Sequence, residues 1–199
     1  MTILDFDEIE KYQEVRDWIL SLTPSQLMEN KQRAVDVVWD LLEYLYVLGY
    51  RTATEEVGDL AEDARPFLPN DYDDLDGAKK TEADKTIYKK FDNKDFRDRV
   101  SQYAELGNAG DIIRVVETDG NRVYNTGGLN AVKGVAKYKT WNTMEDERVR
   151  DTHFFLSDIT VPVEDKFVTY DGDEADAPCG FTDPSNNVNC RCWLTFGNQ

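Results

Sequence analysis

The 199-residue chain has a formal net charge of −17, so nonspecific binding to naked nucleic acid is not expected except through a local basic face. Hydrophobic residues make up 40% of the sequence, enough for a core, and no run of about 18 apolar residues exists to span a membrane. The first ten residues carry four acidic and no basic side chains, so we expect no ordinary signal peptide.

Two amphipathic helices are predicted near the start of the chain. Apolar residues at helical spacing predict the first over residues 4–22. Thr23 can cap a second helix, Pro24 suits its first turn, and Gln26 can complete a capping box. Gly49 either ends this second helix or lies within a longer one.

The second helix carries an unusually wide apolar stripe. It consists of Leu27, Val35, Val38, Leu42 and Leu45, widened by Trp39, Leu41 and Tyr46. A stripe of this width indicates burial on more than one side. We expect it to bind a partner protein, because a short helical pair cannot cover it; packing into the protein's own core is the simpler alternative.

The predicted organisation has three parts. Residues 59–80 combine many aspartates with Pro66, Pro69 and Gly77, which oppose regular structure. We therefore predict a helical element over residues 1–58, an acidic, proline-containing linker over 59–80, and an α+β domain over 81–199.

The α+β domain is expected to begin with helices. Thr81 is the predicted cap of the first, and Asp92-Asn93 separates it from a second over residues 96–103. A third is predicted over residues 112–123, and Gly127-Gly128 is expected to loosen or end it.

Strand patterns follow the helices. Alternation predicts a strand over residues 135–141, and Thr143 is the expected cap of a short helix that ends near Phe155. Apolar runs predict strands over 159–163 and 166–170, and a last strand over 191–196 is expected to close the sheet. Helices followed by a small, mainly antiparallel sheet indicate the α+β class.

The last third of the chain contains a series of motifs in a distinctive order. They are Trp141-Asn142-Thr143, Asp146-Glu147-Arg148-Val149-Arg150 with His153, Glu164-Asp165 before Phe167, Pro178, and Asn189-Cys190-Arg191-Cys192. This order resembles the C-terminal signature of the MuF-like phage head morphogenesis, or minor capsid, proteins. Upstream, Phe96-Arg97-Asp98-Arg99-Val100 and the segment from Arg114 through Glu117-Thr118 to Asn125 resemble the same family's helices.

The resemblance implies a structural role in a bacteriophage head. It implies a few copies bound to the portal protein inside the procapsid, acting in assembly and in DNA packaging or ejection. The implied partners also include the major capsid or scaffolding protein and packaged DNA, with no membrane. The implied location is the capsid interior, and the host cytoplasm during assembly.

Two other functions stay open. Glu145-Asp146-Glu147 is an ExE string like that of ADP-ribosyltransferases, although a charged first helical turn is the favoured interpretation. The first alternative is therefore a phage-delivered effector enzyme, ADP-ribosyltransferase-like or a nuclease. The second is an internal DNA-associated protein that binds DNA through residues 79–99, which contain eight basic and five acidic residues. The sequence has no P-loop and no GxSxG elbow, and we predict no enzymatic turnover.

The only histidine and the three cysteines form a candidate metal set. His153, Cys179, Cys190 and Cys192 supply the Cys₃His ligands of a structural zinc site, and bacterial cytoplasm keeps such thiols reduced. The C-x-C spacing is less typical of zinc than C-x-x-C, which favours the other interpretation. In that interpretation, buried thiols and a hydrogen-bonded His153 hold the last strand in place.

Overall fold

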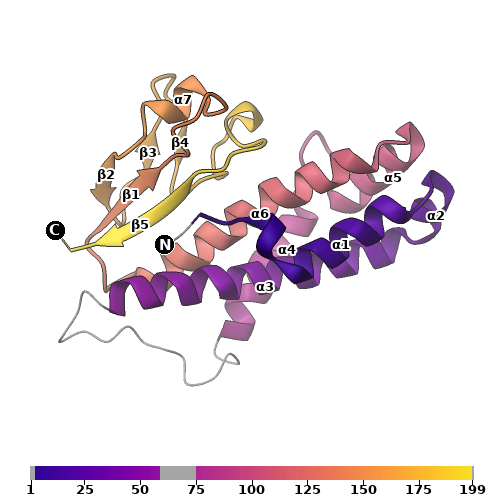
Figure 1. The fold of residues 1–199 in the computed structure, drawn as a ribbon, viewed down its shortest axis with the longest axis horizontal. Helices are drawn as coiled ribbons and strands as arrows, with labels where there is room; N and C mark the ends of the chain where they lie inside the picture. Colours follow the sequence, from indigo (N-terminus) through magenta and orange to yellow (C-terminus); the bar gives the residue numbers. More distant parts are fainter. Residues whose placement is uncertain (1–2, 59–74, 199) are drawn as a thin grey trace.

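The computed structural model describes residues 3–58 and 75–198. Long helices form an elongated layered bundle, and a small sheet unit lies at one end of it (Figure 1). Helices followed by antiparallel strands confirm the predicted α+β class. Among the described residues, no helix has the length and apolarity needed to cross a membrane.

The N-terminal helices begin close to their predicted signals. A short 3₁₀ turn η1 (Phe6–Glu8) precedes α1 (Glu10–Ser21), α2 (Pro24–Glu29) and α3 (Lys31–Gly58). The capping box of Thr23 and Gln26 is present at the start of α2. Gly49 lies inside α3, so the longer-helix alternative is the correct one.

Three further helices complete the bundle: α4 (Asp76–Tyr88), α5 (Phe96–Leu106) and α6 (Ala109–Val132). Residues 76–80, predicted as the end of the linker, are the first turns of α4, and residues 59–74 lie outside the described part of the chain. Thr81 is therefore not a cap; its hydroxyl donates to the Gly77 carbonyl within α4. The other boundaries of the predicted three-part division stay a prediction.

The α4–α5 connection is a tight turn, as the sequence indicated. Asp92 and Asn93 both have left-handed φ angles, 56° and 62°, which these residue types tolerate. Asp95 then starts α5 by accepting from the backbone N–H of Asp98 at 3.0 Å.

The wide apolar stripe, which begins at Leu27 of α2 and continues along α3, is part of the protein's own core, so the prediction that it binds a partner is wrong. All its members except Trp39 are buried, in one cluster with residues of α1, α5 and α6 such as Ile19, Val100 and Ile112. Trp39 is half-buried, and its Nε1 donates to Asp84 of α4 at 2.9 Å. The stripe is wide because α3 packs against several helices of this chain.

Two glycines let α3 and α6 approach closely. An added Cβ at Gly127 would lie 2.2 Å from the Tyr46 carbonyl oxygen, and one at Gly49 would lie 1.9 Å from the Tyr124 carbonyl oxygen. Gly127 and Gly128 do not end α6, contrary to the sequence prediction. Here glycine serves helix packing, which offsets its low helix propensity.

The sheet unit is built around β1 (Tyr138–Asn142), which lies between β2 (Thr160–Pro162) and β5 (Trp193–Gly197), antiparallel to both. A second two-stranded sheet pairs β3 (Phe167–Val168) with β4 (Glu174–Ala175). The expected closing strand is therefore confirmed as β5. Its register places Leu194 opposite Trp141, and both side chains are buried.

The helix predicted after Thr143 is mostly absent. Only α7 (Asp151–Phe154) is helical, and Glu145 has a left-handed φ of 52° that interrupts any helix starting at Thr143. The Thr143 hydroxyl instead contacts the Ser157 hydroxyl at 3.1 Å. The segment between β1 and α7 is thus a loop whose shape depends on contacts with distant residues.

Candidate functional site

Two buried asparagines on α6 fix the backbone of the Asn189-Cys190-Arg191-Cys192 segment. The Asn121 amide donates to the carbonyl oxygens of Cys190 and Cys192 at 3.0 and 3.1 Å. The Asn125 side-chain oxygen accepts from the backbone N–H of Leu194 at 3.1 Å. Because buried polar groups need partners, these bonds set the position of the segment relative to α6.

His153 of α7 faces this segment from the other side. Its Nδ1 lies 3.5 Å from Cys190 Sγ and 3.4 Å from Cys192 Sγ. The three ligand atoms all lie within 4.8 Å of one another, and all three residues are buried. The structure thus brings together three of the four residues predicted as a Cys₃His set.

Cys179, the fourth predicted ligand, lies beside the group but not in it. Its Sγ is 3.8 Å from the Cys190 carbonyl oxygen and 3.6 Å from that of Asn187, both peptide contacts. All three cysteines are free thiols. The ligand set that the geometry supports is therefore His153, Cys190 and Cys192.

The thiols do not ionise alike. Burial opposes ionisation of Cys190, but hydrogen bonds with Cys179, Cys192 and His153 outweigh it and hold the pKa of Cys190 well below its ordinary value. A hydrogen bond to Cys190, and then burial, raises the pKa of both Cys179 and Cys192. Of the three thiols, Cys190 is therefore the one whose surroundings favour ionisation.

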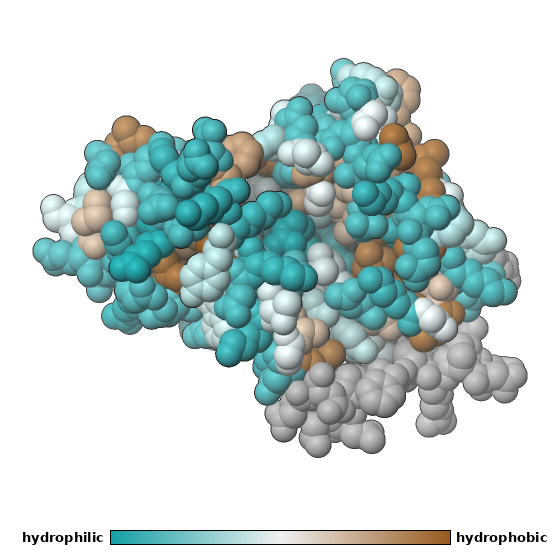
Figure 2. Space-filling view, turned by 180° about the vertical axis from the view of Figure 1, so that it is seen from behind, coloured by the Kyte–Doolittle hydropathy of each residue, from teal (hydrophilic) through white to brown (hydrophobic). Residues whose placement is uncertain are grey.

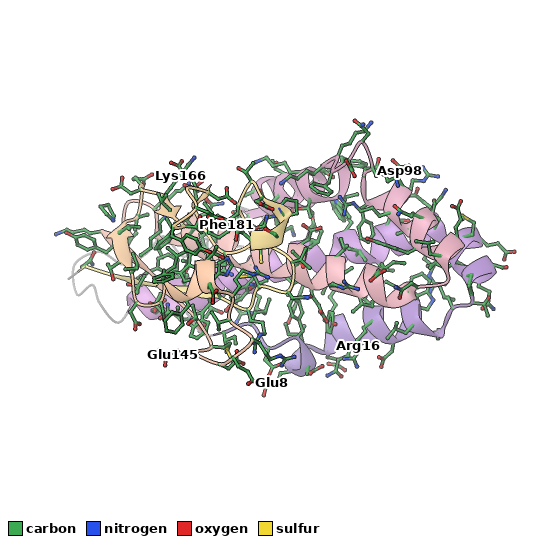
Figure 3. All side chains as sticks on the ribbon, turned by 90° about the horizontal axis from the view of Figure 1, so that it is seen from above. Glu8, Arg16, Asp98, Glu145, Lys166 and Phe181 are labelled. Carbon is green, nitrogen blue, oxygen red and sulfur yellow. The ribbon has the colours of Figure 1, made fainter. Side chains whose placement is uncertain are left out.

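Aromatic side chains enclose the cluster on one side. Trp141 is fully buried, with its ring edge-on to His153 at 5.4 Å between ring centroids. Phe181 lies 5.3 Å from the His153 ring, and Figure 3 shows it where the C-terminal loop crosses α6. Trp141 is therefore a core aromatic residue.

The motif before α7 is bound to the cysteine segment. A terminal nitrogen of Arg191 donates to both carboxylate oxygens of Asp146, at 2.7 and 2.9 Å. Arg150 donates to the Val188 carbonyl, and Thr152 donates to Asn186 at 2.9 Å. Residues far apart in the sequence therefore form one unit around the His–Cys–Cys cluster.

The phage Mu protein F-like family model matches residues 76–195, more than half of the chain. The chain belongs to this family. No curated protein and no solved structure matches it. The matched residues cover α4 to β5 and include every residue of the cluster, so this MuF-like region contains the site described above.

The ExE string of this MuF-like protein does not form the first turn of a helix, contrary to the favoured sequence interpretation. Glu145 and Glu147 are exposed, and Asp146 is bound to Arg191. Figure 3 shows Glu145 at one edge of the sheet unit, with Lys166 at the opposite edge. Glu117 of the family-like helix accepts from the Tyr12 hydroxyl.

A cleft of about 550 Å³ lies between α5, α6 and the loop before β5. It is lined by Lys89, Arg99, Arg114, Arg122 and Asp119 among other residues. The three arginines in this lining have partners on the protein. Arg122 binds Glu82, Arg114 binds Asp111, and Arg99 lies over the Phe91 ring. Of these three arginines only Arg99 belongs to the predicted basic segment of residues 79–99, and Arg114 and Arg122 lie on α6.

Three polar residues of the unit were not identified from the sequence as important: Asn121, Asn125 and Lys139. Lys139 is fully buried, donates to the Asp176 carbonyl at 2.8 Å, and has its pKa lowered by burial. Strand alternation with buried Trp141 was a signal for an inward Lys139. The two asparagines lie on the buried face of α6, where polar residues indicate specific partners.

Asp173 organises the loop that carries Cys179. Its two oxygens accept from the backbone N–H groups of Glu174, Thr182 and Asp183 and from the Asn186 amide, all at 3.0 Å. Partial burial opposes its ionisation, but these hydrogen bonds prevail and lower the pKa of Asp173. The Asp173 side chain therefore holds the loop in place when it is ionised.

Replacing Asp173 with Asn is expected to cost about 1–2 kcal/mol of unfolding free energy at pH 7, given its partial exposure. A lowered folded pKa means that the carboxylate stabilises the fold above the ordinary aspartate pKa of about 3.9. This contribution is lost as pH falls through the lower folded value. Urea unfolding of the unchanged and Asp173→Asn proteins should be measured from pH 7 to pH 3. The difference between their unfolding free energies should shrink below about pH 4.

Asp92→Asn is the matched control. Asp92 is exposed, and Asn tolerates its left-handed backbone, so little change is expected at any of these pH values. A pH-independent loss in the Asp173→Asn protein would show that the carboxylate charge does not hold the loop.

Proposed function

We propose that this protein is a minor capsid protein that binds the portal inside the procapsid and acts in head assembly and DNA packaging or ejection. Membership of the phage Mu protein F-like family carries the proposal, because this family indicates phage head morphogenesis and is typically structural. Portal binding and the packaging role are the specific parts of the proposal. The implied location is the interior of the virion head.

The contacts of the signature residues support a structural role for the protein rather than enzymatic turnover. The signature residues Asp146, Arg150 and Arg191 bind one another or nearby backbone and hold the loops in one arrangement. Glu117, the acidic residue of the family-like helix, contacts α1 through Tyr12. These contacts give the motif residues structural roles that involve no reacting group.

With the α3 stripe buried, a different surface must contact the portal. Phe154, Phe155 and Tyr170 are 61%, 65% and 66% exposed. Their rings touch edge to face, at 6.3 Å between the two phenylalanines and 5.6 Å between Phe155 and Tyr170. The face that Figure 2 presents is mostly hydrophilic, with some apolar side chains among the polar ones. Three exposed rings in mutual contact form an apolar surface of the kind that marks interaction sites. We name these three residues the aromatic patch and propose it as the portal contact.

Changing Phe154 and Phe155 together to Ser is expected to lower incorporation into procapsids by about tenfold or more. An aromatic residue at the centre of an interface commonly contributes about 2 kcal/mol or more to binding. The melting temperature should stay nearly unchanged, because both side chains are mostly exposed. The measurement is the ratio of this protein to portal protein in purified procapsids, determined by quantitative mass spectrometry.

Tyr88→Ser provides the control, because Tyr88 is an exposed aromatic of equal exposure, 66%, at the end of α4 and away from the patch. Its incorporation should match that of the unchanged protein. Normal incorporation of the double variant would remove the aromatic patch from the portal contact. Absence of the unchanged protein from procapsids would contradict the proposed function itself.

A further inference from the structure

The spacing within the His–Cys–Cys cluster matches the coordination shell of a tetrahedral metal ion. A zinc ion binds imidazole nitrogen at about 2.0–2.1 Å and thiolate at about 2.3 Å, which places the nitrogen and each sulfur about 3.5 Å apart. His153 Nδ1 lies 3.5 Å from Cys190 Sγ and 3.4 Å from Cys192 Sγ. The two nitrogen–sulfur distances therefore match those of a zinc site, and all three ligand atoms lie within 4.8 Å of one another.

The Nδ1 atom of His153 cannot by itself bond both sulfur atoms that it faces. A histidine Nδ1 offers either one proton or one lone pair, so it can satisfy one thiol at a time. Here it faces two sulfur atoms at nearly the same distance. A cation between the three atoms would contact all of them at once, and it would neutralise thiolates that burial otherwise disfavours.

The cluster has room for a fourth ligand. A cavity of about 20 Å³ lies beside it, lined by all three cluster residues together with Met144, Arg150 and others. A volume of about 10–15 Å³ or more is sufficient for one water molecule. The buried Nη1 of Arg150 has no hydrogen-bond partner among the described residues, so it can donate to a water there.

We propose that His153, Cys190 and Cys192 bind one zinc ion, with a water molecule from this cavity as the fourth ligand. The ion would link α7 to the start of β5, and so hold together a region that has short strands and long loops. Cys179 is not a ligand in this proposal, because its sulfur contacts backbone carbonyls outside the group. The zinc site adjoins the aromatic patch, because His153 precedes Phe154 in α7, but bound metal is measured separately from incorporation into procapsids.

The test begins with the unchanged full-length protein, purified from zinc-replete cells. Elemental analysis should find about one equivalent of zinc, as a single site requires. Chelation should lower the melting temperature, because metal binding is coupled to folding. Cobalt substitution should give the intense visible bands of tetrahedral coordination together with thiolate charge transfer. Metal-free protein whose stability does not respond to zinc or to a chelator would overturn the proposal.

Variants then identify the ligands. Cys190→Ser, Cys192→Ser and His153→Gln should each lose most of the bound zinc, whereas Cys179→Ser should keep about one equivalent. Circular dichroism of each variant establishes whether it is folded, and the Cys179→Ser result is informative even if a ligand variant does not fold. Loss of zinc from Cys179→Ser would overturn the three-residue ligand set in favour of the Cys₃His set.

Discussion

Removing residues 1–74 is expected to abolish cooperative unfolding of the remaining chain. The deletion removes α1, α2 and α3, whose buried residues include Ile19, Leu27 and Leu45. Each fully buried aliphatic side chain contributes about 1.5–3 kcal/mol, while a whole domain is stable by only about 5–15 kcal/mol. The lost contacts therefore exceed any stability that the remaining residues would keep.

Thermal melts followed by circular dichroism, and binding of a hydrophobic dye, would measure this effect. We expect a broad, non-cooperative melt and strong dye binding by the fragment of residues 75–199. Mixing it with a fragment of residues 1–58 should restore a sharp transition, because the contacts between α3 and α6 are noncovalent. A cooperative melt of the fragment 75–199 by itself would contradict the prediction and would support an independent MuF-like domain.

Changing Gly127 to Ala is expected to destabilise the protein by more than about 3 kcal/mol, at the upper end of overpacking effects. The added Cβ would lie 2.2 Å from the Tyr46 carbonyl oxygen, which is backbone inside α3 and cannot rotate away. The two helices would have to move apart along their shared contact. Tightly packed neighbours oppose this movement. Urea denaturation would measure the change in unfolding free energy.

Gly77→Ala is the control for helix propensity. Gly77 lies exposed near the start of α4, and an added Cβ would meet nothing within 4 Å. This change should be neutral or stabilise by up to about 1 kcal/mol, since Ala favours helix over Gly. A Gly127→Ala protein as stable as the unchanged one would mean that α3 and α6 are not held as closely as the structure has them.

Local signals in the sequence were sufficient to predict an element wherever the contacts that decide it join residues only a few positions apart. Thr23 and Gln26 form their capping box because both partners lie in the same turn. Asp92 and Asn93 take left-handed backbone angles in the turn after α4, which these residue types tolerate. The alternation near the C-terminus likewise predicted β5, and the motif order identified the family that the comparison confirms.

The candidate site was only partly predictable. Ligand chemistry alone selected His153 and all three cysteines, and the structure brings together His153, Cys190 and Cys192. The separation of Cys179 depends on the loop organised by Asp173, whose partners lie up to thirteen residues away. The roles of Asn121 and Asn125 depend on contacts with residues about seventy positions later, which no spacing rule describes.

The sequence by itself determined the α+β class, the capped helix starts and the family, because these depend on periodicity, on contacts within one turn and on motif order. Only the tertiary structure decided that the α3 stripe is core and that Gly127 continues α6. It also decided that the residues after Thr143 form a loop bound to Arg191. In each of these cases a contact with a distant part of the chain outweighs the local preference, since burial and close packing contribute more free energy than propensity.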